Sequence, residues 1–440
     1  MQWRRSISIL LALMLLSVSL VIPRDVRAAE GRREHNMAMI APTTQQQPPA
    51  PPLVEQYLLD GKMQAGQDAL VAQLTRNPKD DQARFGLGML QFLRAVQHLT
   101  QDLYRYGVGE GTAAGKVRLP FLRLQFGYNK QPARLTYNDA RKMAQNLVTE
   151  LNDAEATLAK ITDPDVTLPL HFGMIRIDLN GDGRYDEQET LWTLYSKSTN
   201  NEQITAEKAK DFYVKFDRGD VHWLRGYCNL LAGIAEIYLA YDTTETFDRT
   251  AHLFFPNVET PYKFLNRGKK IHVHGDGDTE IVDFIAFIHT IRWPVVAPER
   301  MANALHHFEA VVAQSKETWK WIMAETDDDH EWLPNPRQTG VIPGAKVTDE
   351  MVTSWLSMMD QINGMLKGEL LIPFWRGDEK VGINVRRVFL EPKPLDLVLW
   401  LQGTAAAPYL EHGRMTEGMT WRNLNQTFGG QFPAFAVWFN

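Results

Sequence analysis

Residues 219–241 read GDVHWLRGYCNLLAGIAEIYLAY, and this stretch decides the class of fold. Its side chains are apolar on nearly every side of a helix, which is typical of a helix at the centre of a large protein or of a membrane span. Arg225, Asn229 and Glu236 interrupt the apolar surface. Charged side chains in the middle of a span are costly, so we expect a buried central helix and not a membrane span.

Helical spacing of apolar residues recurs on both sides of this stretch. Thr136, with Asp139 three residues later, is a variant of the capping box and marks one helix start. The sequence therefore predicts a mainly α, multi-helical fold, and the closing aromatic segment 432–440 is expected in its core. The other predicted helices cover residues 54–74, 80–104, 136–161, 206–216, 244–254, 280–293, 298–326, 348–366 and 396–402.

The composition limits the partners of the chain. It has 440 residues, 44% of them hydrophobic, with 47 Lys and Arg against 53 Asp and Glu, for a formal net charge of -6. A length of this kind allows one large helical domain or two domains. The charge balance provides no electrostatic footprint for nucleic acid or for an anionic membrane surface.

The N-terminus has the pattern of an export signal. Arg4 and Arg5 precede the apolar run 7–22, and small residues end at Ala28, which predicts a signal peptide over residues 1–28. The alternative is an uncleaved anchor, because the apolar run is only slightly shorter than a membrane span. Residues 29–52 are rich in Pro and Gln towards their end and are predicted to be a disordered linker. We expect a periplasmic or secreted protein.

Cys228 is the one cysteine of the chain. An internal disulfide is therefore impossible, and an exported chain without one depends on core packing, to which a bound metal can add. The apolar neighbours of Cys228 predict a buried side chain with no catalytic role.

Residues 178–189, DLNGDGRYDEQE, carry the clearest chemical signal. Calcium takes six to eight oxygen ligands, and this stretch has oxygen-bearing side chains at loop positions 1, 3, 5, 9 and 12 with glycine at position 6. A full protein cage favours Ca2+ over magnesium. The predicted ligands are Asp178, Asn180, Asp182, the carbonyl of Arg184, Asp186 through water, and both oxygens of Glu189.

This spacing resembles the EF-hand-like calcium-binding loop of exported bacterial proteins, in which the first helix is replaced. Residues 174–177 alternate apolar and polar side chains after Gly173, so we expect a short extended segment before the loop and a helix after it. Tyr185 and Thr190 depart from the EF-hand pattern, which has aliphatic and apolar residues there. The second acidic turn, 274–280, lacks a twelfth-position ligand, and a lone loop favours a structural role for calcium.

The N-terminal helical region resembles a tetratricopeptide repeat over residues 54–104. The junction Asn77-Pro78-Lys79-Asp80, followed by Ala83 and the apolar residues after it, carries the likeness. An ordinary helical hairpin is the alternative, because no second copy follows at a fixed period. The resemblance implies a surface that binds other proteins. We expect an N-terminal region at 53–162 and a large helical domain at 163–440.

A metal-dependent exported enzyme is the alternative function. His272 and His274 project from one side of an extended segment, with Asp276 and Asp278 close behind and Asp283, His289, His306 and His307 further along. Spacing assigns no third ligand, and no common hydrolase, zinc-protease or dinucleotide motif is present. Asp217, Asp220 and His222 form another acidic turn, which is predicted to cap the central helix. The favoured interpretation is an exported calcium-binding helical protein with a protein partner and no catalytic residues.

Overall fold

The computed structural model describes residues 51–108, 129–185, 189–199, 209–210, 212–267, 278–342, 346–378, 380–428 and 432–439. It is mainly helical, which confirms the predicted class of fold. The predicted signal peptide and almost all of the predicted linker lie outside these residues. The α-helices are α2 Leu53–Leu59, α3 Met63–Arg76, α4 Asp81–Arg105, α6 Tyr137–Leu158, α7 Leu191–Thr199, α9 Arg218–Ala240, α10 Thr244–Thr250, α11 Asp278–Thr290, α12 Pro298–Ala324, α13 Asp349–Leu366, α14 Val385–Leu390, α15 Leu397–Gln402, α16 Gly418–Thr427 and α17 Phe432–Phe439.

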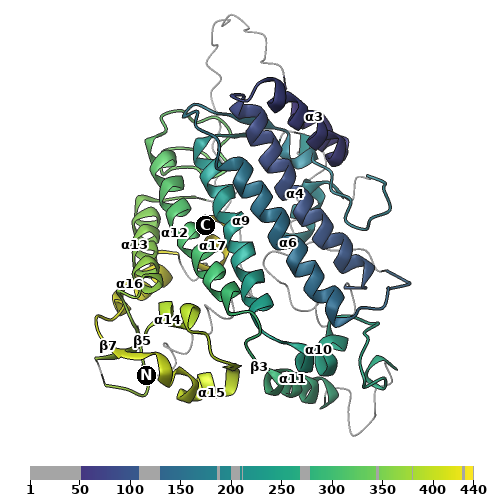
Figure 1. Cartoon of the computed structure of the whole chain (residues 1–440). Helices are drawn as coiled ribbons and strands as arrows, with labels where there is room; N and C mark the ends of the chain where they lie inside the picture. Colours follow the sequence, from purple (N-terminus) through teal and green to yellow (C-terminus); the bar gives the residue numbers. More distant parts are fainter. Residues whose placement is uncertain are drawn as a thin grey trace, which may run out of the picture.

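Helix α9 is the central helix, as its sequence predicts. It packs against α6 on one side and α12 on the other, and Figure 1 shows α4, α6, α9 and α12 side by side. Three polar residues interrupt the apolar surface of α9, and each has a partner at hydrogen-bonding distance on α6 or α12. The pairs are Arg225 Nη2 with Glu155 Oε1 of α6 at 2.8 Å, Asn229 Oδ1 with His307 Nδ1 of α12 at 2.8 Å, and Glu236 Oε2 with Arg300 Nη1 of α12 at 3.0 Å.

Several helix boundaries follow from capping groups in the sequence. The capping box of Thr136 and Asp139 starts α6, and Asp217 and Asp220 form a second capping box at the start of α9. Asp80 caps α4 by accepting a hydrogen bond from the backbone N–H of Ala83. The two capping predictions, at Thr136 and at Asp217, are therefore confirmed.

The predicted helix over residues 54–74 is wrong as a single element. It is divided into α2 and α3 by a turn at residues 60–62, where Gly61 has φ of 71°. A left-handed conformation cannot continue an α-helix. Apolar spacing survives the turn, which is why periodicity alone missed it.

Residues 214–216 are a strand and not the end of the predicted helix 206–216. β2, Val214–Phe216, pairs antiparallel with β1, Leu168–Leu170, and Val214 and Phe216 are buried on one face of the pair. Lys215 points the other way and forms an ion pair with Asp329. Burial that alternates from one residue to the next is typical of a strand. The helical spacing of apolar residues in so short a segment was therefore misleading.

Two further small sheets lie in the C-terminal half. β3, Arg292–Trp293, pairs with β6, Leu395–Asp396, so the helix predicted to reach residue 293 ends at Thr290. The second sheet has the order β4-β5-β7. Its strands are β4 Ile372–Pro373, β5 Val381–Ile383 and β7 Leu410–His412. Figure 1 places β5 and β7 at the end of the molecule that also carries α14 and α15.

The buried core crosses the boundary predicted at residues 162 and 163. Its largest cluster runs from Val54 to Ile161 on one side and from Val166 to Ala232 on the other. At the C-terminus, Phe439 is fully buried against Trp319 and Trp355, which confirms the core placement of the closing aromatic segment.

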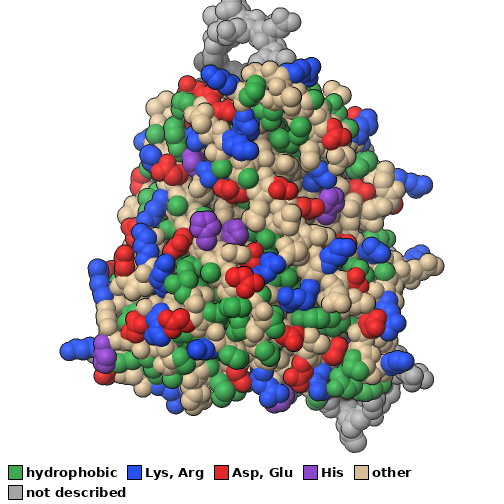
Figure 2. All heavy atoms as spheres, viewed as in Figure 1, with side chains coloured by type: hydrophobic (Ala, Val, Ile, Leu, Met, Phe, Trp, Pro, Cys, Tyr) green, Lys and Arg blue, Asp and Glu red, His purple; other side chains and the backbone are tan. Residues whose placement is uncertain are grey.

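The surface is charged but mixed. Figure 2 shows acidic and basic side chains interspersed over the visible face. Among the described helices, none has the length and apolar character needed to cross a membrane.

Candidate functional site

The loop that begins at Asp178 is closed at its base by backbone hydrogen bonds. Arg176 and Thr190 form an isolated antiparallel bridge. Ile177 N donates to the Glu189 carbonyl at 3.0 Å, and Leu191 N donates to the Ile175 carbonyl at 2.9 Å. The bridge brings the first and twelfth positions of the loop together, and Glu189 Oε1 accepts from Leu179 N at 3.1 Å.

The segments that flank the loop agree with the predicted departure from an EF-hand. A single 3-10 turn, Phe172–Met174, stands where the entering helix would be, and Ile175 is extended with φ of -59° and ψ of 133°. Helix α7 follows the loop from Leu191. The chain therefore enters extended and leaves as a helix.

Inside the loop, the backbone folds around the Asp178 carboxylate. Asp178 Oδ1 accepts from Gly181 N at 2.6 Å, and Oδ2 accepts from Gly183 N at 3.1 Å. Both glycines have positive φ, 75° and 71°, which the turn requires. The glycine expected at position 6 therefore has the conformation that permits the sharp bend.

The side chains at the third and fifth loop positions also accept hydrogen bonds from backbone N–H groups of the loop. Asn180 Oδ1 accepts from Asp182 N, and Asp182 Oδ1 accepts from Arg184 N, both at 2.8 Å. The Arg184 residue is exposed, so a carbonyl ligand at this position would not bring the cationic group towards an ion.

Burial differs strongly between the loop ends and the loop tip. Asp178 is 5% exposed and Glu189 is 6% exposed, whereas Asp182 is on the surface. Two buried carboxyl groups at the closure of one loop create a negative potential. Burial raises the pKa of the neighbouring Tyr185 hydroxyl, and the charges of Asp178 and Glu189 raise it further.

The loop is fixed to α4 and α2 through its first residues. Gln97 Oε1 accepts from Asp178 N at 3.1 Å, and Gln101 Nε2 donates to the Asp178 carbonyl at 2.9 Å. Arg176 N donates to the carbonyl of Leu58, the next-to-last residue of α2, at 3.1 Å. The loop therefore joins the N-terminal helices to α7.

Both departures from the EF-hand pattern have a structural cause. The Tyr185 ring lies over Gly61, so closely that a Cβ at Gly61 would come within 2.1 Å of the ring. Thr190 Oγ1 accepts from Thr193 N at 3.3 Å and caps the start of α7. An aliphatic residue at either position would lose these contacts.

The structure brings five of the six predicted ligands into one loop, Asp178, Asn180, Asp182, Arg184 and Glu189, and Asp186 lies outside the described residues. The carboxyl groups of Asp178, Asp182 and Glu189 do not converge as a set of three within 4.8 Å. The ligand assignment at Asp182 thus rests on spacing and not on convergence.

The histidines of the alternative enzyme site do not assemble within the described chain. His272, His274 and Asp276 lie outside it. His307 is 8% exposed and bound to Asn229, and Asp283 lies 3.7 Å from His252 Nε2. No described histidine belongs to a group of three possible metal ligands.

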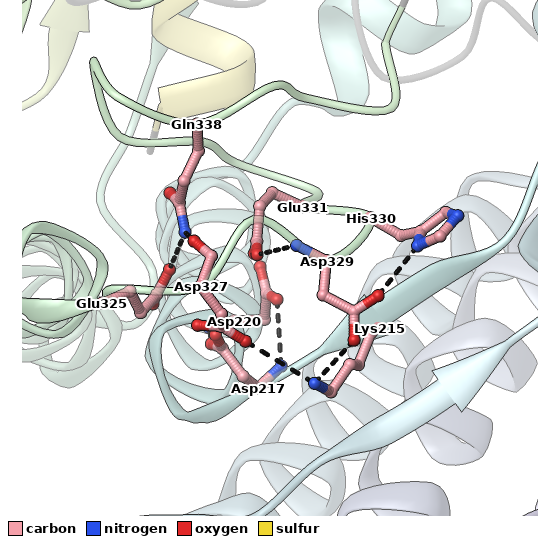
Figure 3. Close-up of polar contacts among 9 residues, drawn as sticks. All are labelled: Lys215, Asp217, Asp220, Glu325, Asp327, Asp329, His330, Glu331 and Gln338. Carbon is pink, nitrogen blue, oxygen red and sulfur yellow. Dashed lines mark hydrogen bonds and ion pairs between the residues drawn. The ribbon is translucent and has the colours of Figure 1, made fainter. Parts of the chain in front are cut away.

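A second acidic cluster, which we call the α9 acid cluster, consists of Asp217, Asp220, Glu325 and Glu331. Asp217 caps α9, Glu325 caps the C-terminus of α12, and Glu331 follows in the next loop. One carboxylate oxygen from each of these three lies within 4.8 Å of the other two, the closest such group in the described chain. Figure 3 shows the acidic side chains converging from α9 and the loop after α12.

Burial determines the protonation of this cluster. Asp220 is 4% exposed and Glu331 is 5% exposed. Burial, together with the charge of Asp217, raises the pKa of Glu325 to about 10 and that of Glu331 to about 7. The pKa values of Asp217 and Asp220 are raised for the same reason.

Sequence reasoning identified only part of the α9 acid cluster. Asp217 and Asp220 were expected as helix caps, and they are caps. Glu325 and Glu331 belong to the segment ETDDDHE at 325–331, which resembles an ordinary solvated acidic turn. Only the packing of α12 against α9 brings that turn to Asp217.

The fold and these two acidic sites define a mainly α-helical protein with carboxylate-rich candidate metal sites. No protein family, no curated protein and no solved structure matches the chain.

Proposed function

We propose that the protein is an exported calcium-binding helical protein in which calcium has a structural role. The ion would be held by Asp178, Asn180, Asp182, Asp186 and Glu189, with the Arg184 carbonyl completing the set. The observation that carries this proposal is the burial of Asp178 and Glu189, 5% and 6% exposed, on the two sides of the bridge that closes the loop.

The location of the loop supports a structural role. Its first residue is bonded to Gln97 and Gln101 of α4, its eighth residue covers the α2–α3 turn, and its last residue leads into α7. An ion that neutralises Asp178 and Glu189 would hold these three parts together. With calcium at about 100 times its Kd, binding to the folded chain alone adds about 2.7 kcal/mol of stability.

The N-terminal helices form the protein-binding part of the proposal. Helices α2, α3 and α4 pack on one another, and Leu53 and Val71 remain 42% and 48% exposed. These exposed apolar side chains and the tetratricopeptide resemblance support a partner surface on this hairpin. Val71→Glu should leave the melting temperature nearly unchanged and weaken binding of that partner.

Thermal unfolding with and without calcium tests the calcium proposal. The melting temperature of the wild-type chain should rise in excess calcium relative to excess chelator. Asp178→Ala and Glu189→Ala should abolish the rise, since each removes a ligand from the buried end of the loop.

Two control variants separate ligand loss from general damage. Arg184→Ala keeps the carbonyl at position 7 and should keep the calcium response. Asp165→Ala removes an exposed carboxylate outside the loop and should keep it as well. An unchanged melting temperature of the wild-type chain on adding calcium would contradict the proposal.

A further inference from the structure

The α9 acid cluster has the dimensions of a cation site. Calcium-oxygen distances are about 2.3–2.6 Å, so two oxygens on one ion lie at most about 5 Å apart. The nearest carboxylate oxygens of Asp217, Glu325 and Glu331 all lie within 4.8 Å of one another. They come from the start of α9, the end of α12 and the loop that follows, so one ion could contact all three segments.

Helix capping uses only some of the oxygens in this cluster. Asp217 Oδ1 accepts from Gly219 N at 2.7 Å, and Asp220 Oδ2 accepts from Asp217 N at 3.1 Å. Glu325 Oε2 accepts from Gln338 Nε2 at 3.1 Å. Asp220 Oδ1 is buried and has no hydrogen-bond partner, whereas the carboxyl groups of Glu325 and Asp217 share a hydrogen bond.

Asp220 gives independent support for a ligand. It is only 4% exposed, and burial raises its pKa, to which the charges of the neighbouring Asp217 and Glu331 add (Figure 3). A buried carboxylate oxygen without a donor is unfavourable by several kcal/mol unless a proton or a cation binds it. Helix capping alone does not require this second oxygen.

The basic residues nearby are paired with other acids. Lys215 Nζ lies 2.8 Å from Asp329 and 3.6 Å from Asp327, at the outer edge of the cluster. His330 Nδ1 lies 3.0 Å from Asp329. Within the described chain, no Lys, Arg or His forms an ion pair with Asp217, Asp220, Glu325 or Glu331, so only protons or a bound cation can neutralise these carboxylates.

We propose that Asp217, Glu325 and Glu331, with Asp220 beside them, form a binding site for a hard divalent cation that joins the start of α9 to the end of α12. The donors are all carboxylate oxygens, which suit calcium, magnesium or manganese, whereas zinc prefers nitrogen and sulfur donors. This site is separate from the 178–189 loop and does not depend on it.

The test is a cation titration of the full chain with the loop site removed. Asp178→Ala protein, freed of metal, is titrated calorimetrically with calcium, magnesium and manganese in turn. One binding event per chain is expected for at least one of these ions. Asp217→Asn and Glu331→Gln, each added to Asp178→Ala, should weaken that event about tenfold or more, because each removes one ligand charge.

These variants are chosen to preserve the fold. Asn is as good an N-cap as Asp, so Asp217→Asn should keep the cap of α9. Asp328→Asn is the matched control: Asp328 is exposed in the same loop, and an amide oxygen can still accept from Thr339 N. It should leave the binding event unchanged.

One combination of results would show that no cation binds the α9 acid cluster. If none of the three ions binds Asp178→Ala protein, and Asp217→Asn and Glu331→Gln raise the melting temperature equally with and without cation, the cluster is neutralised by protons and the proposal is wrong. If Asp178→Ala does not fold, the same titration in the wild-type background decides, because Asp217→Asn should then remove one of two binding events.

Discussion

Asp178 and Asp217 show why the surroundings of an aspartate can be predicted from sequence in one place and not in another. All the ligands predicted with Asp178 lie within twelve residues, so their spacing alone indicates calcium. The neighbours of Asp217 lie on α12 and the loop after it, about a hundred residues away. Spacing could predict the helix cap that Asp217 makes, but not the acidic cluster around it.

His307 is the residue whose titration should be visible in the stability of the fold. Its Nδ1 donates to Asn229 Oδ1, and the Asn229 amide is oriented by a 2.9 Å bond from Nδ2 to the Arg225 carbonyl. Burial lowers the pKa of His307, with the charge of His306 adding to the effect and that of Glu236 opposing it.

The sign of the pH effect follows from that lowered pKa. Below the unfolded pKa of about 6.5 the unfolded chain binds more protons at this residue, so the His307 contribution is complete above about pH 6.5 and is lost as pH falls. The free energy of unfolding of wild type should therefore fall more steeply between about pH 7 and pH 5 than that of His307→Gln. Chemical denaturation at several pH values measures both slopes, and parallel slopes would refute this role for His307.

Among the elements, those with a capping group and a long apolar stripe were predicted closely. Helices α4, α6 and α13 begin within one residue of their predicted starts, and α12, which has Pro298 at its first position and no side-chain cap, begins where predicted. The errors are at short segments: the turn inside 54–74, and the strand Val214–Phe216 inside 206–216. In both segments, contacts with distant parts of the chain determine the backbone conformation, and the local periodicity of apolar residues does not reveal such contacts.

The turn between α2 and α3 provides a prediction at this scale. Gly61 has φ of 71°, and the Tyr185 ring occupies the place of a side chain there. In Gly61→Ala the left-handed backbone alone costs about 1–2 kcal/mol, and displacement of the ring adds to that. The variant should unfold at a lower denaturant concentration and bind calcium more weakly.

Gly418→Ala is the matched control for that substitution. Nothing lies within 4 Å of a Cβ at Gly418, and its φ is in the ordinary range. Its stability should match wild type. Equal stability of Gly61→Ala and Gly418→Ala would show that the Tyr185 contact does not constrain the turn.

At the scale of the whole molecule, α9 packs between α6 and α12. The reactivity of the Cys228 thiol therefore measures how often this packing opens. The side chain is 1% exposed, and burial raises the pKa of its thiol far above the ordinary range. Both effects suppress the reactive thiolate. Alkylation of native protein should be negligible, and its rate should rise only as the whole chain unfolds.

An exposed cysteine provides the reference rate for the alkylation experiment. Ser357 lies on the exposed side of α13, so Ser357→Cys in a Cys228→Ala background should react rapidly. Fast labelling of native Cys228 at a rate close to that of this control would mean that α9 opens without global unfolding.

Contacts between distant segments are the feature of the whole molecule that the sequence predicts least well. Apolar spacing predicts the long helices α4, α6, α9, α12 and α13, and it predicts that α9 is central. It does not predict that the buried core continues across residues 162 and 163, or that the loop after α12 returns to the start of α9. The predicted domain boundary and the tetratricopeptide resemblance stay predictions.

Calcium titration of the metal-free wild-type chain tests the central claim most directly, with Asp178→Ala and Arg184→Ala titrated beside it. We expect a calcium-binding event in wild type and in Arg184→Ala that is missing in Asp178→Ala, because the ion is held by the buried carboxylate at the first loop position. Identical calcium binding in all three proteins, or none in wild type, would contradict a calcium site at residues 178–189.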